Sequence, residues 1–167
     1  MFMLINKNME SIDMPNLRKT GTSFLHNNEK IRKISFPKLE KVSSAFMVRN
    51  EFLEEAYLPN LLSLGTNFLA NNKALRELDL PSVQVIGSAF LHGNRVLERL
   101  SMPRLQTIKD GFLENNTNLT YLNIDSVQMI YGEFLPLNET LEEIHASNLR
   151  PFFKKQLSTR FKIIPKE

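Results

Sequence analysis

The 167 residues are enough for one domain with a substantial core. Apolar residues make up 42% of the chain and charged residues 23%, which is ordinary for a globular protein, and the net charge of +3 is a weak indicator of any partner. Because the chain has no cysteine, disulfides, thiolate metal ligands and a cysteine nucleophile are excluded.

The N-terminal segment, residues 1–20, is interpreted as a truncated first coil of a repeat protein. Its opening residues include a short apolar run, but no basic residue precedes the run, and Asn6 and Lys7 end it. A signal peptide is therefore not expected. No later apolar run approaches the roughly 18 residues of a membrane-spanning helix. The expected location is the cytoplasm or the destination of a signal-independent route.

Three residue types recur along the chain with a strict period of 22 residues. The period is carried by seven phenylalanines, seven asparagines and five prolines. The phenylalanines are Phe2, Phe24, Phe46, Phe68, Phe90, Phe112 and Phe134. The asparagines are Asn6, Asn28, Asn50, Asn72, Asn94, Asn116 and Asn138, and the prolines are Pro15, Pro37, Pro59, Pro81 and Pro103. Self-similarity at a fixed period of this length is the signature of a solenoid.

Each repeat contains a pattern Leu-x-x-Leu-x-Leu, as at Leu75, Leu78 and Leu80. The alternation predicts one half-buried strand per repeat, and these strands are expected to stack into one parallel sheet on the concave face. Short strands and turns are expected to return along the other side. One repeat is weaker, because Ala56 stands where the others have leucine or isoleucine. The predicted fold is a leucine-rich-repeat solenoid of about seven repeats over residues 1–152.

The ladder residues are predicted to be structural. The phenylalanines should stack on one another inside, and each asparagine should hydrogen-bond the backbone of the next coil. Because they recur in every repeat, they cannot mark one site. Gly21, Gly65 and Gly87 indicate a turn that needs positive φ.

Residues 80–90, LPSVQVIGSAF, resemble the BspA-like class of leucine-rich repeats. The resemblance extends from residue 2 to about residue 152. The sequence departs from the family's usual Ala-Phe pair, because only Phe46 and Phe90 follow an alanine. The resemblance implies bacterial or protist proteins used for adhesion or host contact, or modules of secreted effectors. It implies no catalytic residues, because the family has none in common.

Two columns of outward strand residues form the candidate binding face. The candidate partner-binding residues are Tyr57, Glu77, Asp79, Arg99, Tyr121 and His145. Exposed tyrosines are frequent interface hot spots, and Arg99 can clamp a carboxylate. The alternative interpretation is a set of solvated strand residues. A third column alternates in charge and is predicted to hold the register through ion pairs. Its members are Glu10, Arg32, Glu54, Arg76, Glu98, Thr120 and Glu142.

Nothing in the sequence predicts catalysis, a metal or another cofactor. His26 and His92 occupy the same repeat position three coils apart, roughly 14 Å, which is too far for one metal ion. His145 has only surface acids beside it. The chain contains no serine-nucleophile or phosphate-loop motif. An enzyme is therefore not expected.

The period fails after Phe152, and residues 153–167 are interpreted as a C-terminal cap or tail. Phe153, Leu157, Phe161 and Ile164 recur at near-helical spacing with basic residues between them, which predicts a capping helix. The alternative is a basic amphipathic helix on a membrane or nucleic acid.

Three functions remain open on the sequence. The first is protein binding by a bacterial effector-like or adhesin-like module. The second is carbohydrate or cell-surface binding by the concave tyrosines. The third is a structural segment of a larger protein, with self-association through open solenoid ends. Nucleic-acid binding is not expected, and a membrane is a weaker alternative.

Overall fold

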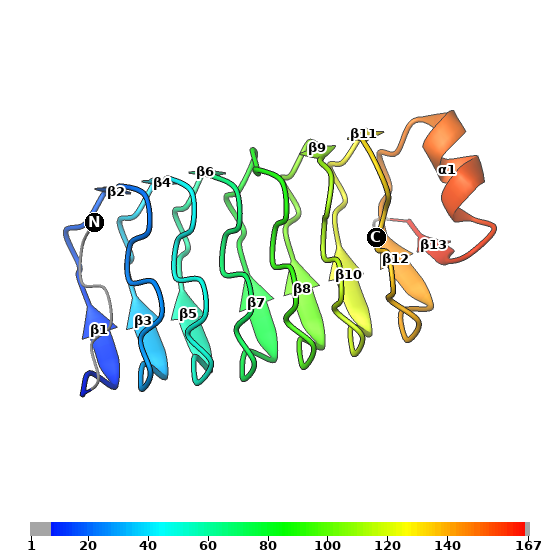
Figure 1. The fold of residues 1–167 in the computed structure, drawn as a ribbon. Helices are drawn as coiled ribbons and strands as arrows, with labels where there is room; N and C mark the ends of the chain where they lie inside the picture. The colour runs from blue at the N-terminus through cyan, green and yellow to red at the C-terminus, as the bar shows by residue number, and fades with distance from the viewer. Residues whose placement is uncertain (1–7, 166–167) are drawn as a thin grey trace.

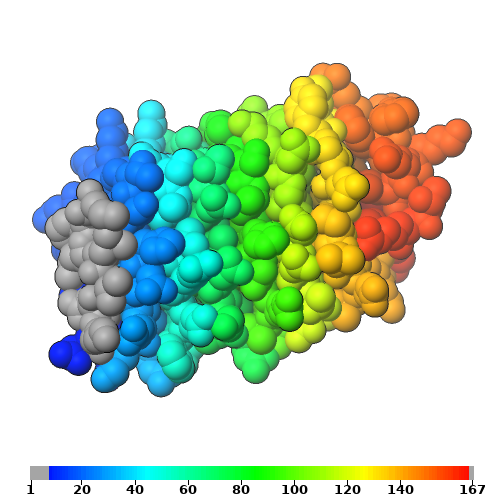
Figure 2. Space-filling view, viewed as in Figure 1, coloured from blue at the N-terminus to red at the C-terminus, as the bar shows by residue number. Residues whose placement is uncertain are grey.

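The computed structural model describes residues 8–165, and these form a single row of stacked coils (Figure 1). The first asparagine and phenylalanine of the sequence ladders, Asn6 and Phe2, lie outside the described residues. In the space-filling view, successive segments of the chain form consecutive bands along the rod (Figure 2). Each coil therefore contacts mainly its two neighbours, as the predicted solenoid requires.

Two rows of short parallel strands run along the rod. Paired strands within the repeats are 22 positions apart along the chain, as Arg99 pairs with Tyr121. The longer row contains β1 (Ser11–Asp13), β3 (Lys33–Ser35), β5 (Glu55–Tyr57), β7 (Glu77–Asp79), β8 (Arg99–Ser101), β10 (Tyr121–Asn123) and β12 (Glu143–His145). The return row contains β2 (Lys19–Thr20), β4 (Lys41–Val42), β6 (Ser63–Leu64), β9 (Thr107–Ile108) and β11 (Met129–Ile130). The outer surface of the longer row, predicted as the concave face, is called the strand face below.

The strand face consists of two sheets, where the sequence predicted one. β1, β3 and β5 form a three-stranded sheet, and β7, β8, β10 and β12 belong to a five-stranded sheet with a further strand, β13 (Lys162–Ile164). Within the described chain, no backbone hydrogen bond joins β5 to β7. The two strands also stand further apart than their neighbours do (Figure 1). We call this break the seam.

Two sequence features account for the seam. Ala56 occupies the inward position of β5, where the other coils have leucine or isoleucine, and it stays partly exposed. Glu55 and Glu77 stand at the same repeat position on its two sides, and like charges on adjacent strands repel. The return row remains bonded here, since the Gln84 amide donates to the Leu62 carbonyl over 3.0 Å. The break is therefore confined to the strand face.

Restoring the missing side chain should close the seam. Ala56→Leu is expected to raise the free energy of unfolding by about 1–2 kcal/mol, because it buries apolar surface between Ile34 and Leu78. Equilibrium urea denaturation measures the change. Ile34→Leu, which keeps side-chain volume at the same position of the preceding coil, serves as the control for altered shape. A lower stability for Ala56→Leu would mean that the seam has no room for the side chain.

The phenylalanine ladder forms the centre of the core, as predicted. Phe46, Phe68, Phe90 and Phe112 are completely buried. Neighbouring rings lie nearly parallel, with centroids 5.4 Å apart for Phe46 and Phe68 and 5.7 Å apart for Phe68 and Phe90. These are the distances of offset-stacked aromatic pairs. The coils are thereby joined by a continuous column of rings.

The backbone around each phenylalanine alternates between positive and negative φ. Ala45, Met47 and Arg49, for example, have φ of 57°, 51° and 58°. Left-handed backbone is unfavourable for residues with a Cβ, but here it turns their amides to neighbouring coils. The Met47 amide donates to the Phe24 carbonyl over 2.9 Å. The arc is therefore stabilised by contacts between coils and not by local preference.

The glycine prediction is wrong for this turn. Gly65 and Gly87 do not have positive φ; the glycines that do are Gly93, Gly111 and Gly132. A Cβ on Gly65 would lie 2.6 Å from the backbone nitrogen of Ser44, and one on Gly87 would collide with the backbone of Gly65. Glycine is required at these positions because successive coils approach too closely for a side chain.

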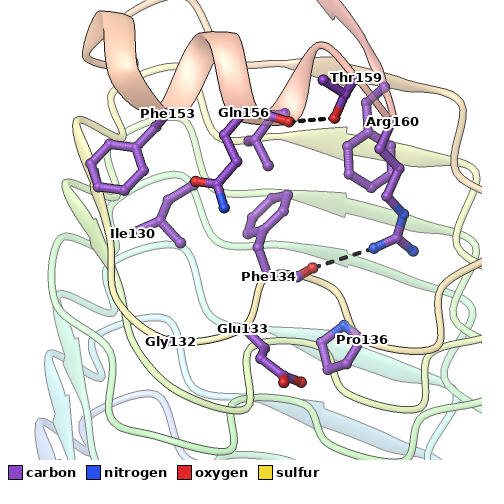
Figure 3. Close-up of a pocket in the computed structure, with 11 residues that line it drawn as sticks. Ile130, Gly132, Glu133, Phe134, Pro136, Phe153, Gln156, Thr159 and Arg160 are labelled. Carbon is purple, nitrogen blue, oxygen red and sulfur yellow. Dashed lines mark hydrogen bonds between the residues drawn. The ribbon is translucent and has the colours of Figure 1, made fainter.

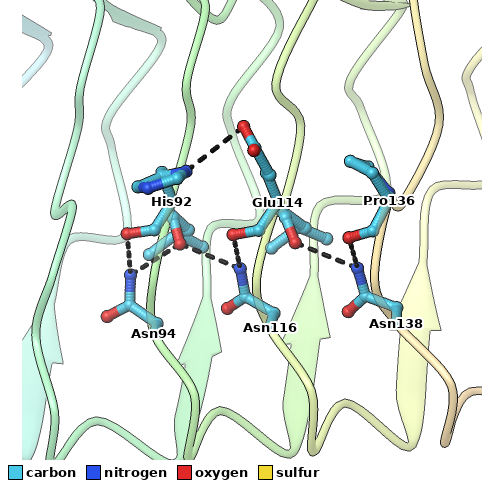
Figure 4. Close-up of polar contacts among 8 residues, drawn as sticks. His92, Asn94, Glu114, Asn116, Pro136 and Asn138 are labelled. Carbon is cyan, nitrogen blue, oxygen red and sulfur yellow. Dashed lines mark hydrogen bonds and ion pairs between the residues drawn. The ribbon is translucent and has the colours of Figure 1, made fainter.

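The asparagine ladder is buried and joins the coils, although the side chains from Asn50 to Asn138 reach back to the preceding coil and not to the next (Figure 4). The Asn94 amide group donates to the Leu69 carbonyl of the preceding coil over 2.9 Å and to the Leu91 carbonyl of its own over 2.7 Å. Its side-chain oxygen accepts from the Asn72 backbone amide at 3.2 Å. One side chain thus pairs three backbone groups that no regular sheet would pair.

The C-terminal residues cover the last coil. Helix α1 (Pro151–Leu157) buries Leu157, and Phe161 packs edge-on against Phe134 at 6.1 Å, so that the ring column ends there. The Arg160 side chain donates to the carbonyls of Leu135 and Asn138. Residues 162–164, predicted as helix from their spacing, instead form β13 and pair with β12. They add a strand because the edge of β12 would otherwise stay open.

Candidate functional site

Five of the six predicted site residues lie together on the strand face. β7 carries Glu77 and Asp79, β8 carries Arg99, β10 carries Tyr121 and β12 carries His145. Alternation along each strand points them outward, because the residues between them, such as Leu78 and Leu100, are buried. All of them except His145 border a shallow depression of about 340 Å³ over β7, β8 and β10.

Arg99, Tyr121 and His145 form a contiguous row. The guanidinium carbon of Arg99 lies 4.1 Å from the centroid of the Tyr121 ring. The Tyr121 and His145 rings are 5.1 Å apart, at an interplanar angle of 44°. Stacking of this kind holds a guanidinium flat by its attraction to the aromatic quadrupole. The three side chains therefore contact one another along the strand face.

Tyr57, the sixth predicted site residue, lies on the other side of the seam. Its side chain is 59% exposed. Its strand, β5, belongs to the three-stranded sheet, whereas the other five residues belong to the five-stranded sheet. The structure therefore does not join Tyr57 to the row, although a ligand crossing the seam can contact both.

Ion pairs join adjacent coils, as predicted, but not at every step of the alternating column. Arg32 pairs with Glu54 at 2.5 Å, and Arg76 pairs with Glu98. Across the seam, Glu54 and Arg76 form no ion pair. Two further pairs lie on the strand face, Lys33 with Glu55 and Lys162 with Glu143. The second was not predictable from the repeat, because Lys162 lies beyond it in β13.

The histidines outside the row lie apart from the strand face. His92 Nδ1 is 3.3 Å from Glu114 Oε2, on the arc that carries the asparagine ladder (Figure 4). His26 Nδ1 is buried without a hydrogen-bond partner. Across residues 8–165, no three His, Cys, Asp or Glu side chains come together in an arrangement that could hold a metal ion.

A second hollow, of about 480 Å³, lies between the last coil and the cap (Figure 3). It opens beside Phe134, which is only partly buried, and Gln156 lines it where the period would place the next phenylalanine. Phe153 and Ile130 complete its apolar wall. The hollow is the space that an eighth ladder ring would fill, and so the break in the repeat accounts for it. Sequence analysis did not predict this hollow.

Over the described residues, no helix has the length and apolar character needed to span a bilayer. α1 has seven residues and exposes Arg150, Lys154 and Lys155 around its start and middle. Phe152 beside them is 72% exposed.

Comparison with known proteins identifies the repeat. The family described as BspA type Leucine rich repeat region matches residues 2–76 and 43–142 with six copies. No curated protein and no solved structure matches the chain. The matched residues span most of the chain and contain the strands from β1 to β11, the phenylalanine ladder and the asparagine ladder. The chain belongs to the BspA-type leucine-rich-repeat family.

Proposed function

We propose that the chain is a non-catalytic recognition module that binds a protein partner through the strand face. The observation that carries this proposal is the row of Arg99, Tyr121 and His145, in which Arg99 stacks on Tyr121 and Tyr121 contacts His145, all three at least partly exposed. Arginine and tyrosine are enriched among the residues that dominate binding energy at protein interfaces. Solenoids commonly bind through a surface of this kind, in which outward residues vary on a constant scaffold.

Family membership supports placing the partner outside the cell of origin. BspA-like repeats resemble those of bacterial adhesins and secreted effectors, and an effector-like or adhesin-like module is the role that we propose. No nucleic-acid contact is part of this proposal. The family scaffold is typically non-catalytic, which agrees with an absence of catalytic motifs from the sequence.

Carbohydrate binding is a weaker second candidate. It depends on tyrosine faces that are open to a sugar ring. One face of Tyr121 is covered by Arg99, so the larger open ring on the strand face is Tyr57, which is 59% exposed. A single open ring favours stacking on one sugar at most. A glycan array would identify this activity, and binding abolished by Tyr57→Ala alone would support it over protein binding.

The proposal is tested with two matched triple variants. The strand-face variant combines Tyr57→Ala, Arg99→Glu and Tyr121→Ala. The control variant combines Val85→Ala, Arg104→Glu and Tyr131→Ala, which are similar changes at exposed residues outside the strand face. Both variants should unfold at the same temperature as the native chain.

Affinity capture from cell lysates, followed by titration of the captured protein, measures the effect. The native chain and the control variant should bind the same protein, and the strand-face variant should bind it about tenfold or more weakly. Equal binding by all three would place the site elsewhere. A chain that captures only further copies of itself would favour a structural segment that associates through its ends.

A further inference from the structure

Arg99 differs from the other cations of the strand face in having no charged partner. Lys33 pairs with Glu55, and Lys162 pairs with Glu143 at 2.5 Å. In both cases the acid lies on the adjacent strand, so cross-strand pairing is the usual arrangement of this surface. Arg99 also has an acid opposite it on an adjacent strand, Glu77. It nevertheless forms no ion pair with Glu77 and stacks on Tyr121, on its other side.

The stacking leaves the hydrogen-bonding edge of the guanidinium unused. Within residues 8–165, no side-chain hydrogen bond or ion pair involves the Arg99 guanidinium, whose recorded contact is with the ring face. A guanidinium that is stacked through its plane still presents its N–H groups at the edge. These N–H groups match the two oxygens of a carboxylate in a bidentate geometry. Arg99 is therefore oriented for an acidic group that the chain itself does not supply.

The neighbouring acids are unpaired as well. Glu77 and Asp79 are exposed on β7, and within the described chain neither forms an ion pair. β7 is the edge of its sheet at the seam, so no basic side chain of a paired strand stands on that side. A purely acidic ligand would be repelled by these two carboxylates, and a purely basic one by Arg99. The surface is complementary to a ligand that carries both charges.

Resting on the proposed function, we propose that the strand face binds a peptide segment with a basic and an acidic residue close together. The basic side chain lies against Glu77 and Asp79, and the acidic side chain lies against the edge of Arg99. These two partners stand on adjacent strands, about 4.8 Å apart. An extended peptide rises about 3.3 Å per residue. Because alternate residues of an extended peptide face the same surface, the two charged residues of the ligand should be two positions apart, about 6.6 Å.

Selection from a random peptide library tests the charge pattern. Phage that display random 12-residue peptides are selected against the immobilised full chain, and the bound peptides are sequenced. The same selection is made against Arg99→Gln, against Glu77→Gln with Asp79→Asn, and against Lys162→Gln. The last variant removes a strand-face cation that already has a partner, so it controls for a general change in surface charge. All the substitutions are at exposed residues, and matched melting temperatures confirm folding.

Peptides selected by the native chain should carry oppositely charged residues two positions apart, at about ten times their frequency in the starting library. Arg99→Gln should remove the acidic preference and keep the basic one. The variant with Glu77→Gln and Asp79→Asn should remove the basic preference and keep the acidic one. Lys162→Gln should keep both preferences. Selected peptides without this charge pair, or with an acidic preference that survives Arg99→Gln, would overturn the inference and leave the protein-binding function standing. Failure to select any peptide would count against both.

Discussion

Replacing Phe68 by alanine is expected to lower the free energy of unfolding by about 3–5 kcal/mol. Phe68 is completely buried and stacks between Phe46 and Phe90, at centroid distances of 5.4 and 5.7 Å. The substitution removes both ring contacts and leaves a cavity. The cavity cannot collapse, because hydrogen bonds between coils hold the backbone, such as the 2.9 Å bond from the Leu69 amide to the Phe46 carbonyl.

Denaturant titration followed by circular dichroism measures this loss. Phe152→Ala is the control, since it removes the same ring from a position that is 72% exposed. It should change stability by about 0.5 kcal/mol or less. If Phe68→Ala cost about as little as the control, the stacked column would not be the centre of the fold.

Asn72→Ala is expected to destabilise the fold by about 2–5 kcal/mol, because it leaves two buried backbone groups unpaired at about 1–3 kcal/mol each. The side-chain amide donates to the Met47 carbonyl at 3.0 Å and to the Leu69 carbonyl at 2.7 Å. Its oxygen accepts from the Asn50 amide at 3.1 Å. The Leu69 carbonyl keeps a second bond, from the Asn94 side-chain amide at 2.9 Å. The Met47 carbonyl and the Asn50 amide, which belong to the preceding coil and are buried, are the two groups that lose their partner.

The last asparagine of the ladder supplies a matched comparison. Asn138 donates to the Leu113 carbonyl at 3.0 Å and to the Pro136 carbonyl at 3.2 Å, while its side-chain oxygen has no hydrogen-bond partner. Asn138→Ala therefore removes fewer bonds and should cost measurably less than Asn72→Ala in the same denaturant titration. Equal losses would mean that the side-chain volume, and not the bonds to the preceding coil, determines the cost.

The strand-face proposal and the stability predictions are independent of each other. The ladder residues lie inside the rod, whereas Arg99, Tyr121 and His145 lie on its surface. Since surface substitutions away from special features usually change stability little, strand-face variants should lose binding without unfolding. This separation allows a loss of binding to be attributed to the missing side chains.

The sequence alone was sufficient for the features that repeat. A period of 22 residues places like residues side by side in successive coils, so the stacked phenylalanines, the buried asparagines and the outward columns all followed from spacing. Ion pairs between coils followed for the same reason. Each of these features depends on which residue stands at a repeat position, and that can be counted along the chain.

The tertiary structure decided the features that depend on competition between neighbours. Ala56 was visible as a weak position, but only packing shows that it coincides with a break between β5 and β7. Glycine at Gly65 is required by the closeness of the preceding coil's backbone and not by its own φ. Arg99 lies 22 residues after Glu77 and 22 residues before Tyr121, so the spacing alone does not predict which of the two it contacts. At an exposed site, the interaction free energies of stacking on the ring and of pairing with the acid differ by about 1 kcal/mol or less. The choice between them is therefore set by side-chain geometry, which the order of residues does not contain.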